Sequence, residues 1–310
     1  MSRPDPRRPT VTRFSVDPAA TIAGVVKTVL PIAHYDDREG YDPDFLMPAG
    51  RVPFPALAAA KKADAAKVVG GGTHLHYTNF SVMISKSRRM CVYSACNVDG
   101  KKRKKSPRSN QWRRDPRVKL ELQILEECYG RDQDGFFSRG HMTRREDPVW
   151  GPKAMAVLAE KDTFHVTNAV PQMQGHNGAI WLSLEDHVLQ NADKADQKVS
   201  VFTGPVLKKS DPVIHDVKIP VQLWKVVAFV RPKTKQLAAV AYLDSQAEFL
   251  PDTGGPSFVW GQFKGLQVPV ARITQLTGLN FGPLKNADVL AGAGPAFAYS
   301  VTRVQDILLR

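Results

Sequence analysis

Six short segments with the composition of β-strands constrain the fold of this chain more than any other feature of its sequence. NFSVMIS at 79–85 and MCVYSACNV at 90–98 are separated by the polar turn KSRR, so they predict a β-hairpin. The remaining segments are TFHVTNAV at 163–170, VSVFTGPVL at 199–207, QLWKVVAFVRP at 222–232 and QLAAVAYLD at 236–244. We therefore expect an α+β fold with a central antiparallel sheet.

Helix-forming segments surround these strands. Residues 177–192 carry apolar side chains at helical spacing, which predicts a helix with one buried face. The other predicted helices cover 21–30, ended by Pro31, 56–69, ended by Gly70, and the segments 153–161 and 269–279.

The chain of 310 residues is long enough for one large domain or two small ones. We expect the main domain over 74–285. Residues 1–20 contain four prolines and predict a flexible arm. Residues 21–73 form an N-terminal extension, a candidate regulatory or docking segment. Residues 286–310 are apolar enough to pack back onto the domain as a C-terminal tail.

Cysteine usage and hydropathy bear on the compartment. Cys91, Cys96 and Cys128 are odd in number and lack metal-ligand spacing, so they indicate reduced thiols rather than a disulfide framework. The apolar run TIAGVVKTVLPIA is too short to span a bilayer and is broken by Lys27 and Pro31. We see no signal peptide, and we expect a cytoplasmic protein without a membrane partner.

The charge balance favours a polyanionic partner. The 43 Lys and Arg residues against 30 Asp and Glu give a net charge of +13 and an isoelectric point near 9.7. Nucleic acid is the first candidate partner and an anionic membrane surface the second. A basic protein with neither partner stays an alternative.

Residues 101–119, which we call the basic loop, concentrate this charge. Ten of these nineteen residues are Lys or Arg, and Trp112 lies among them. A solvated loop is the plain interpretation. A loop that binds a phosphate backbone and stacks on a base is the functional one. The predicted nucleic-acid-binding residues are Lys101, Lys102, Arg103, Lys104, Lys105, Trp112, Arg113 and Arg114, with Arg144 and Arg145 further along the chain.

Three further motifs combine the groups that phosphodiester hydrolysis needs. They are SRGH at 138–141, TNAVPQ at 167–172 and HNGAIWLSLED at 176–186. Asn177 and Glu185 fall on one face of the predicted helix, where their oxygens suit Mg²⁺. A neutral His141 can act as a general base, and its arginine neighbours disfavour the imidazolium form. Arginines can also hold the phosphate.

At these motifs the chain resembles the sugar-non-specific DNA/RNA endonucleases with a ββα-metal (His-Me) finger, the endonuclease G-like family. The family pattern runs DRGH, then N-x-x-PQ, then (F/L)NQGAW-x-x-LE, in the order seen here. The segments VFTGPV, PVQLWKVV and VARITQLTGLNF also resemble later parts of the family. The resemblance covers roughly 74–285 and implies a ββα-metal active site on the antiparallel sheet.

The resemblance also implies roles for individual residues. His141 is the general base that activates water, and Asn177 is the sole direct protein ligand of Mg²⁺, for which Mn²⁺ or another divalent cation can substitute. Glu185 holds metal-bound waters. Arg139 contacts the phosphate, and Asn168 orients the site through hydrogen bonds. An upstream arginine assists, for which Arg108 is our candidate and Arg113 an equal alternative.

Three departures from the family pattern stand beside this match. Ser138 replaces the leading Asp, His176 replaces the residue before the metal-binding Asn, and NGAIW replaces NQGAW. Structural alternatives also stay open. Asn177 can be a helix N-cap, Glu185 a solvated acid and Asn168 a turn former. The pair in THLHY, at 73–77, lacks further ligands at metal spacing.

The leading hypothesis is a metal-dependent endonuclease that cleaves DNA, RNA or both. The first alternative is a non-catalytic nucleic-acid-binding protein that retains the fold. A further alternative is an effector nuclease regulated by a protein partner through residues 1–70. Family members are often homodimers, so we also expect a homodimer.

Overall fold

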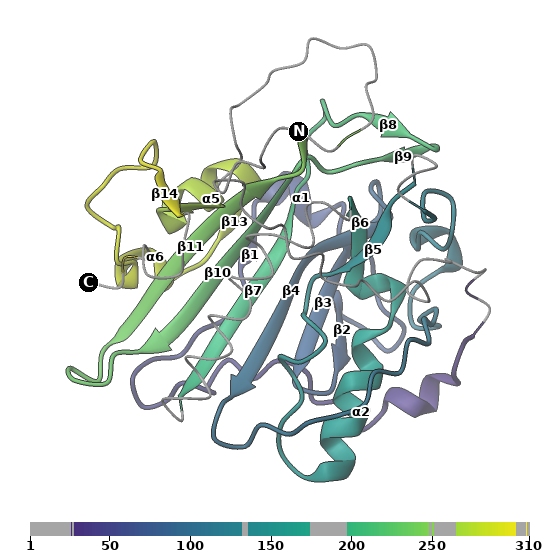
Figure 1. The fold of residues 1–310 in the computed structure, drawn as a ribbon, viewed down its shortest axis with the longest axis horizontal. Helices are drawn as coiled ribbons and strands as arrows, with labels where there is room; N and C mark the ends of the chain where they lie inside the picture. The colour runs from purple at the N-terminus through teal and green to yellow at the C-terminus, as the bar shows by residue number, and fades with distance from the viewer. Residues whose placement is uncertain are drawn as a thin grey trace, which may run out of the picture.

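The structure is a computed structural model that describes residues 26, 28–131, 136–173, 197–247, 250, 265–301 and 308. Its central element is an eight-stranded sheet in which every neighbouring pair of strands is antiparallel, in the order β14-β12-β11-β10-β7-β4-β3-β2 (Figure 1). Its strands are β2 (His74–Tyr77), β3 (Phe80–Ser85), β4 (Met90–Asp99), β7 (Lys198–Val206), β10 (Gln222–Val230), β11 (Leu237–Ser245), β12 (Gly265–Val268) and β14 (Tyr299–Val301). The predicted α+β fold with a central antiparallel sheet is confirmed.

Five of the six predicted strands lie on β3, β4, β7, β10 and β11. The sixth prediction, 163–170, is largely wrong. Helix α2 (Lys153–Thr163) runs into this segment and a 3-10 helix, η5 (Val166–Asn168), follows, so that the only strand overlapping it is β6 (Ala169–Gln172). Hydrogen bonds from side chains to the backbone stabilise the part of this segment that is not a strand. Thr163 Oγ1 donates to Glu160 O, and Asn168 Nδ2 donates to Thr163 O.

Two predicted helices near the N-terminus also require correction. Of the segment 21–30, the described residues are not helical, because Val29 forms an isolated parallel bridge with Arg114 and Thr28 O accepts the Arg114 N–H at 2.9 Å. The segment 56–69 contains a strand, β1 (Ala56–Leu57), and only one turn of helix, α1 (Ala59–Lys62). Asp64 then accepts hydrogen bonds from Ser85 and Ser87, which turns the chain toward the end of β3.

Two helix predictions later in the chain are confirmed. The segment 153–161 lies within α2, and 269–279 contains α5 (Val270–Thr277), which ends at Gly278 in the left-handed conformation, φ 68°. The predicted helix 177–192 lies outside the described residues. The remaining elements are η2 (Ile32–Tyr35), η3 (Leu120–Leu122), β5 (Ser138–His141), β8 (Val213–Ile214), β9 (Val217–Lys218), β13 (Leu279–Asn280) and α6 (Leu284–Ala287).

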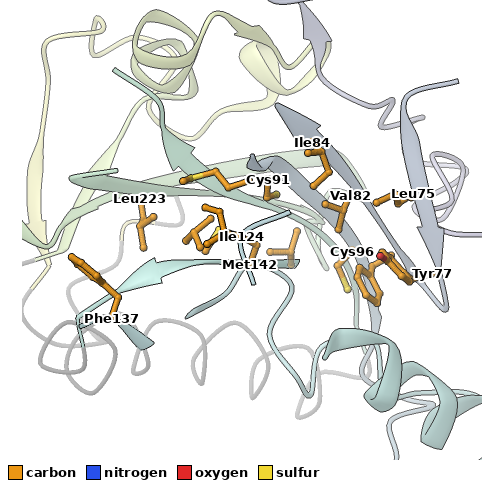
Figure 2. Packing of buried hydrophobic residues seen from close by; sticks show 14 of the residues in the cluster. Leu75, Tyr77, Val82, Ile84, Cys91, Cys96, Ile124, Phe137, Met142 and Leu223 are labelled. Atoms are coloured by element: carbon orange, nitrogen blue, oxygen red, sulfur yellow. The ribbon is translucent and has the colours of Figure 1, made fainter. Parts of the chain in front are cut away.

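Alternating side chains of the sheet bury two separate clusters. On β10, Leu223 and Val227 belong to one cluster, whereas Trp224 and Val226 belong to the other. We call the first side the β5 face, because Phe137 and Met142, which flank β5, pack there; Figure 2 shows these residues against the sheet. The second side, covered by α5 and α6, is the α5 face.

Residues 32–52 contribute to both clusters. Tyr35 lies in the cluster of the β5 face, whereas Tyr41 and Phe45 lie in that of the α5 face. Between them, Gly40 has φ +80°, and a Cβ atom there would lie 2.3 Å from His76 Nδ1, so only glycine fits the crossing. The N-terminal extension expected from sequence therefore supplies core residues to the same sheet.

Within the residues that the structure describes, no helix combines the length and the apolar character needed to cross a bilayer. All three cysteines are buried and unpaired, on the β5 face. In the C-terminal tail, Leu290 is buried and β14 pairs with β12 at one end of the sheet.

Candidate active site

The hairpin of β5 and β6 positions His141. The two strands are antiparallel, with His141 opposite Ala169 and Ser138 opposite Gln172, and they lie over the sheet in Figure 1. A Cβ atom at Gly140 would lie 2.0 Å from Gln172 Cδ, because the glutamine side chain rests on that glycine. The glycine of the SRGH motif is thus required by the close approach of Gln172.

Aromatic rings enclose the His141 imidazole. Its centroid lies 4.8 Å from that of Trp112 and 5.0 Å from that of Phe164, with the latter ring edge-on. The residue keeps some exposed surface, but its Nε2 atom is buried and has no hydrogen-bond partner among the described residues. The described residues therefore leave the hydrogen-bonding capacity of this nitrogen unused.

The pKa of His141 is lowered to about 3, chiefly by burial and in smaller part by the positive charges of Arg108 and Arg145. The imidazole is consequently neutral at physiological pH. Sequence reasoning predicted this neutrality but attributed it to neighbouring arginines alone. Burial against Trp112 and Phe164 is the larger cause.

Two arginines flank this aromatic cluster. The Arg139 guanidinium lies 4.6 Å from the Tyr129 ring and 5.7 Å from the Trp112 ring, and it donates to Leu125 O. Burial lowers the pKa of Arg139. Arg108 is exposed and lies 5.4 Å from the Phe164 ring, so it reaches the same cluster from the basic loop.

The alternative upstream arginine, Arg113, points into the protein. It is buried, and its guanidinium donates to Lys161 O at 3.0 Å and to Gln111 Oε1 at 2.9 Å. Because the Arg113 side chain is buried, the structure does not support its predicted contact with nucleic acid. Of the two candidates, Arg108 is the one whose charge acts on His141.

Asn168 is buried behind His141 and braces the segment that follows it. Its Oδ1 accepts the Thr143 N–H at 2.8 Å, and its Nδ2 donates to the carbonyl oxygens of Thr143 and Thr163, each at 3.0 Å. Its own carbonyl accepts the Met142 N–H at 2.8 Å. These bonds are a physical means for the orienting role that the family resemblance implies, and that role stays a prediction.

The basic loop is exposed at Lys101, Lys102, Lys104 and Lys105. Three arginines near it share one acid. Arg103 lies 3.2 Å and Arg144 3.7 Å from Glu146 Oε2, and Arg145 pairs with the other carboxylate oxygen. Trp112 packs against His141 rather than projecting from the loop, and Arg114 is partly buried. The loop thus divides into an exposed lysine portion and a packed portion beside His141.

Gln172 is a further candidate site residue, which sequence reasoning did not single out. Its carboxamide is buried, and neither Oε1 nor Nε2 has a hydrogen-bond partner among the described residues. The available signal was its place as the last residue of TNAVPQ, which becomes informative only when β6 is paired with β5. It lies opposite Ser138, where the family pattern has Asp.

The predicted metal ligands Asn177 and Glu185 lie outside the described residues, as does His176. Within the described ranges, no group of three or more His, Cys, Asp and Glu side chains could hold a metal ion. The THLHY histidines serve structure instead. His74 Nε2 bonds to Tyr93 Oη at 2.8 Å and His76 Nδ1 to Ser81 Oγ at 2.9 Å.

A buried polar network supports the hairpin from behind. The Tyr77 hydroxyl bonds to Asp115 at 2.6 Å and to Thr167 at 2.7 Å. The Tyr35 hydroxyl bonds to His165 Nε2 at 2.8 Å. These contacts tie the end of the basic loop and residues 32–38 to η5, the segment that places Asn168.

Comparison with known proteins places this geometry in a family context. A family model described as DNA/RNA non-specific endonuclease matches residues 61–288. The uncharacterized protein y4fB of Sinorhizobium fredii is 38% identical over 296 residues, which are 89% of this chain and 44% of that protein. Mitochondrial nuclease EXOG of Danio rerio is 29% identical over 163 residues, 47% of this chain and 43% of that protein.

Human mitochondrial endonuclease G is 26% identical over 170 residues, 51% of this chain and 51% of that protein. The chain thus spans about half the length, or less, of these curated relatives. A crystal structure of the EndoG/EndoGI complex, which concerns the inhibition of EndoG, matches with a TM-score of 0.52 and 21% identity. The match covers 68% of this chain and 86% of that one, and it shows a shared fold.

Proposed function

Because this chain belongs to the DNA/RNA non-specific endonuclease family, we propose that it is a metal-dependent nuclease that hydrolyses phosphodiester bonds in DNA, RNA or both. One observation carries the proposal. His141 is held on β5 with a lowered pKa and an unpaired, buried Nε2, beside the cationic side chains of Arg108 and Arg145. A neutral imidazole with an unpaired Nε2 can accept a proton from water, and the anionic phosphate of a bound substrate would raise the pKa of this base toward the working pH.

In the proposed mechanism, His141 takes a proton from the attacking water through Nε2. General base catalysis of this kind contributes about 10²- to 10⁴-fold to a rate. Asn168 keeps the backbone after His141 in place through its three side-chain hydrogen bonds. The rings of Trp112 and Phe164 exclude water from the imidazole edges that they cover.

Arg139 and Arg108 hold the scissile phosphate in this proposal. Their guanidinium groups approach the His141 cluster from β5 and from the basic loop respectively. Positive groups fixed before the reaction stabilise the charge that develops on phosphate oxygens without further reorganisation. A guanidinium fork also matches the geometry of a phosphate.

The described half of the site fits a hydrated divalent cation. Two buried acceptor atoms, His141 Nε2 and Gln172 Oε1, lack donors among the described residues, and hydrated Mg²⁺ brings water donors with it. Asn177 would hold the ion directly and Glu185 would hold its waters. When bound, Mg²⁺ supplies charge neutralisation at the scissile phosphate and the leaving oxygen.

The exposed lysines of the basic loop supply affinity for the backbone. Affinity that comes from phosphate neutralisation falls with salt, with a slope of log affinity against log salt near −0.9 per phosphate contact on duplex DNA. We therefore expect binding to weaken steeply as salt rises. Binding that is insensitive to salt would contradict this part of the proposal.

The decisive experiment is cleavage of plasmid DNA and of RNA by the wild type with Mg²⁺, by the wild type with EDTA, and by His141→Ala. We expect loss of cleavage in the last two, with His141→Ala slower by about 10²- to 10⁴-fold. His34→Ala is a matched control, because His34 bonds to Arg38 away from this cluster. Full cleavage by His141→Ala would overturn the assignment of His141 as the general base. Salt-sensitive binding without metal-dependent cleavage by the wild type would overturn the nuclease assignment and favour the non-catalytic alternative.

Regulation by a protein partner through residues 1–70 stays part of the proposal, as does a homodimer. Removing all 70 residues is a poor test, because it deletes Tyr35 and Tyr41 from the two cores. Deletion of residues 1–25 alone keeps both tyrosines in place. Unchanged activity, toxicity and mass by light scattering would remove residues 1–25 from the regulatory proposal.

A further inference from the structure

A pocket of about 590 Å³ lies beside the basic loop at the start of α2. Lys101, Lys102 and Lys104 line one part of it, and Trp150 and Met155 line another. Its size falls within the range of small-molecule sites in proteins. The lining combines cationic groups with an aromatic ring and a polarisable thioether. Cationic groups can bind the phosphate of a nucleotide, and the ring and the thioether can pack against its base.

The Trp150 side of the pocket is fixed in place. Its indole Nε1–H donates to Asn97 O at 2.7 Å, and its ring lies 5.5 Å from the Phe45 ring at an angle of 34°. Phe45 belongs to the core of the α5 face. The indole therefore does not need to be ordered when a ligand arrives, which lowers the entropic cost of stacking on it.

The lysine side is tied to Trp150 through the backbone. Lys104 N–H donates to Val149 O at 2.9 Å, and Gly151 N–H donates to Lys102 O at 3.0 Å. Arg103 and Trp150 form an antiparallel bridge between these bonds. The lysines thus branch from a backbone segment held against the aromatic one, so a ligand can contact both at once.

Three lysines give the pocket positive charge. The Asp99 carboxylate lies 4.0 Å from Lys102 Nζ and offsets part of that charge. Helix α2 begins beside the pocket with no acidic residue in its first turn and no side-chain cap, so its N-terminal N–H groups add to the positive potential. An anionic group such as a phosphate is favoured here.

The pocket is also continuous with the His141 site along the chain. The segment from His141 to Trp150 carries Arg144 and Arg145, and Arg145 influences the pKa of His141. Glu146 joins these two arginines to Arg103, which precedes the pocket residue Lys104. Three arginines and one acid therefore lie in the chain segments between the His141 hairpin and the pocket.

We propose that this pocket binds one unpaired nucleotide of the substrate strand, with its base against Trp150 and Met155 and its phosphate at Lys101 and Lys104. This inference rests on the proposed nuclease function. A base within a duplex is already stacked and paired, so it enters such a pocket only after extrusion. The enzyme therefore binds single strands, or duplexes with unpaired nucleotides, more tightly than uninterrupted duplex.

The test measures binding in the His141→Ala protein with EDTA, so that no cleavage occurs. The probes are a fluorescein-labelled oligothymidine of about 20 nucleotides and a blunt duplex of the same length. We expect Trp150→Leu to weaken binding of the single strand by about 10-fold, because one base–aromatic stack is lost, and to change duplex binding much less. Trp150→Phe, which keeps a ring, should recover most of this loss.

A second set of variants keeps the test independent of Trp150, whose removal could unfold the protein. Met155→Glu places a carboxylate in the pocket and should likewise weaken single-strand binding selectively. The double variant Lys101→Ala, Lys104→Ala should make the slope of log affinity against log salt for the single strand shallower by about 1.4, because two phosphate contacts are lost. The charge-matched control is Lys62→Ala with Lys233→Ala, two exposed lysines outside the pocket, which should leave the slope unchanged.

Equal effects on single strand and duplex, or no effect on either, in both Trp150→Leu and Met155→Glu would overturn the pocket assignment. That result can occur while His141-dependent cleavage is intact, so it leaves the proposed function standing. Selective loss of single-strand binding in a protein that shows no metal-dependent cleavage would support the pocket and reject the nuclease function. The two proposals therefore fail separately.

Discussion

The two faces of the central sheet differ in how completely their polar groups are satisfied. On the β5 face, the buried atoms Arg139 Nε and His141 Nε2 and both polar atoms of the Gln172 carboxamide have no hydrogen-bond partner in the described part of the chain. No such atom among the described residues comes from α5, α6 or residues 41–52, which cover the α5 face. Unsatisfied buried polar groups cost free energy, so the group of them around His141 agrees with the active site proposed there.

The α5 face illustrates the opposite design. Trp224 is buried there with its indole N–H donating to Pro205 O at 3.1 Å, and its ring lies 5.4 Å from that of Phe281. Apolar packing closes this side of the sheet. Both faces bury apolar clusters, so the difference between them is that the β5 face also carries buried polar atoms without partners among the described residues.

Substitution of Trp224 is the strongest way to sharpen this contrast. Trp224→Ala leaves a cavity in the α5 face and should lower the free energy of unfolding by about 3–5 kcal/mol. Because Trp224 lies on the side away from His141, cleavage per folded molecule should be unchanged. Denaturant unfolding and a cleavage assay corrected for the folded fraction measure the two effects. A large loss of specific activity at full folding would break the separation of the two faces.

Gly140→Ala tests the β5 face, with a smaller effect on stability. The new Cβ would meet Gln172, so we expect a loss of about 1–3 kcal/mol together with reduced cleavage, because Gln172 and the hairpin must shift. Gly292→Ala is the matched control, since its Cβ would have no neighbour within 4 Å. Unchanged cleavage in Gly140→Ala would show that the seating of Gln172 is irrelevant to the site.

The pH dependence of cleavage distinguishes burial from charge at His141. With a pKa of about 3, His141 should impose no acidic limb on kcat/KM between pH 5 and 7. Arg108→Gln removes a charge that lowers this pKa, so the acidic limb should move upward, toward 6.5. Lys233→Gln, on an exposed lysine, should leave it in place. A wild-type limb near 6.5 would contradict the burial seen here.

The same lowered pKa affects stability with a definite sign. The unfolded chain has an ordinary histidine pKa of 6.5, whereas the folded protein has a value near 3. Neutral His141 therefore contributes fully to stability above pH 6.5, and the contribution is lost as the pH falls from 6.5 toward 3. Replacement by a neutral residue should flatten the fall in stability over this range, as measured by denaturant unfolding at several pH values.

Tyr35→Phe should give the smallest effect of this series. It removes one buried hydrogen bond, to His165, and should lower the free energy of unfolding by about 1 kcal/mol. Tyr299→Phe is the control, because Tyr299 is exposed. No difference between the two variants in denaturant unfolding would show that residues 32–38 do not help to hold η5.

Five strands of the sheet and the SRGH and TNAVPQ motifs could be recognised from sequence because their signals are local, whereas the short strands β2, β12 and β14 were not predicted. Strands β3, β4, β7, β10 and β11 each contain enough apolar residues to be recognised alone. The segment 163–170 could not be, because bonds from Asn168 and Thr163 override its strand-like composition. Arg113 and Trp112 looked like exposed members of a charged loop, and only the tertiary contacts with Lys161 and His141 show that they turn inward.

The burial of Cys91, Cys96 and Cys128 has a practical consequence. Burial raises the pKa of each thiol, so the thiolate that reacts with maleimides is scarce at neutral pH. These are the only cysteines in the chain. The native protein should therefore be nearly inert to thiol-directed dyes, and a cysteine introduced at an exposed position such as Lys233 should accept a single fluorophore. That background suits energy-transfer measurements that test the proposed binding of nucleic acid.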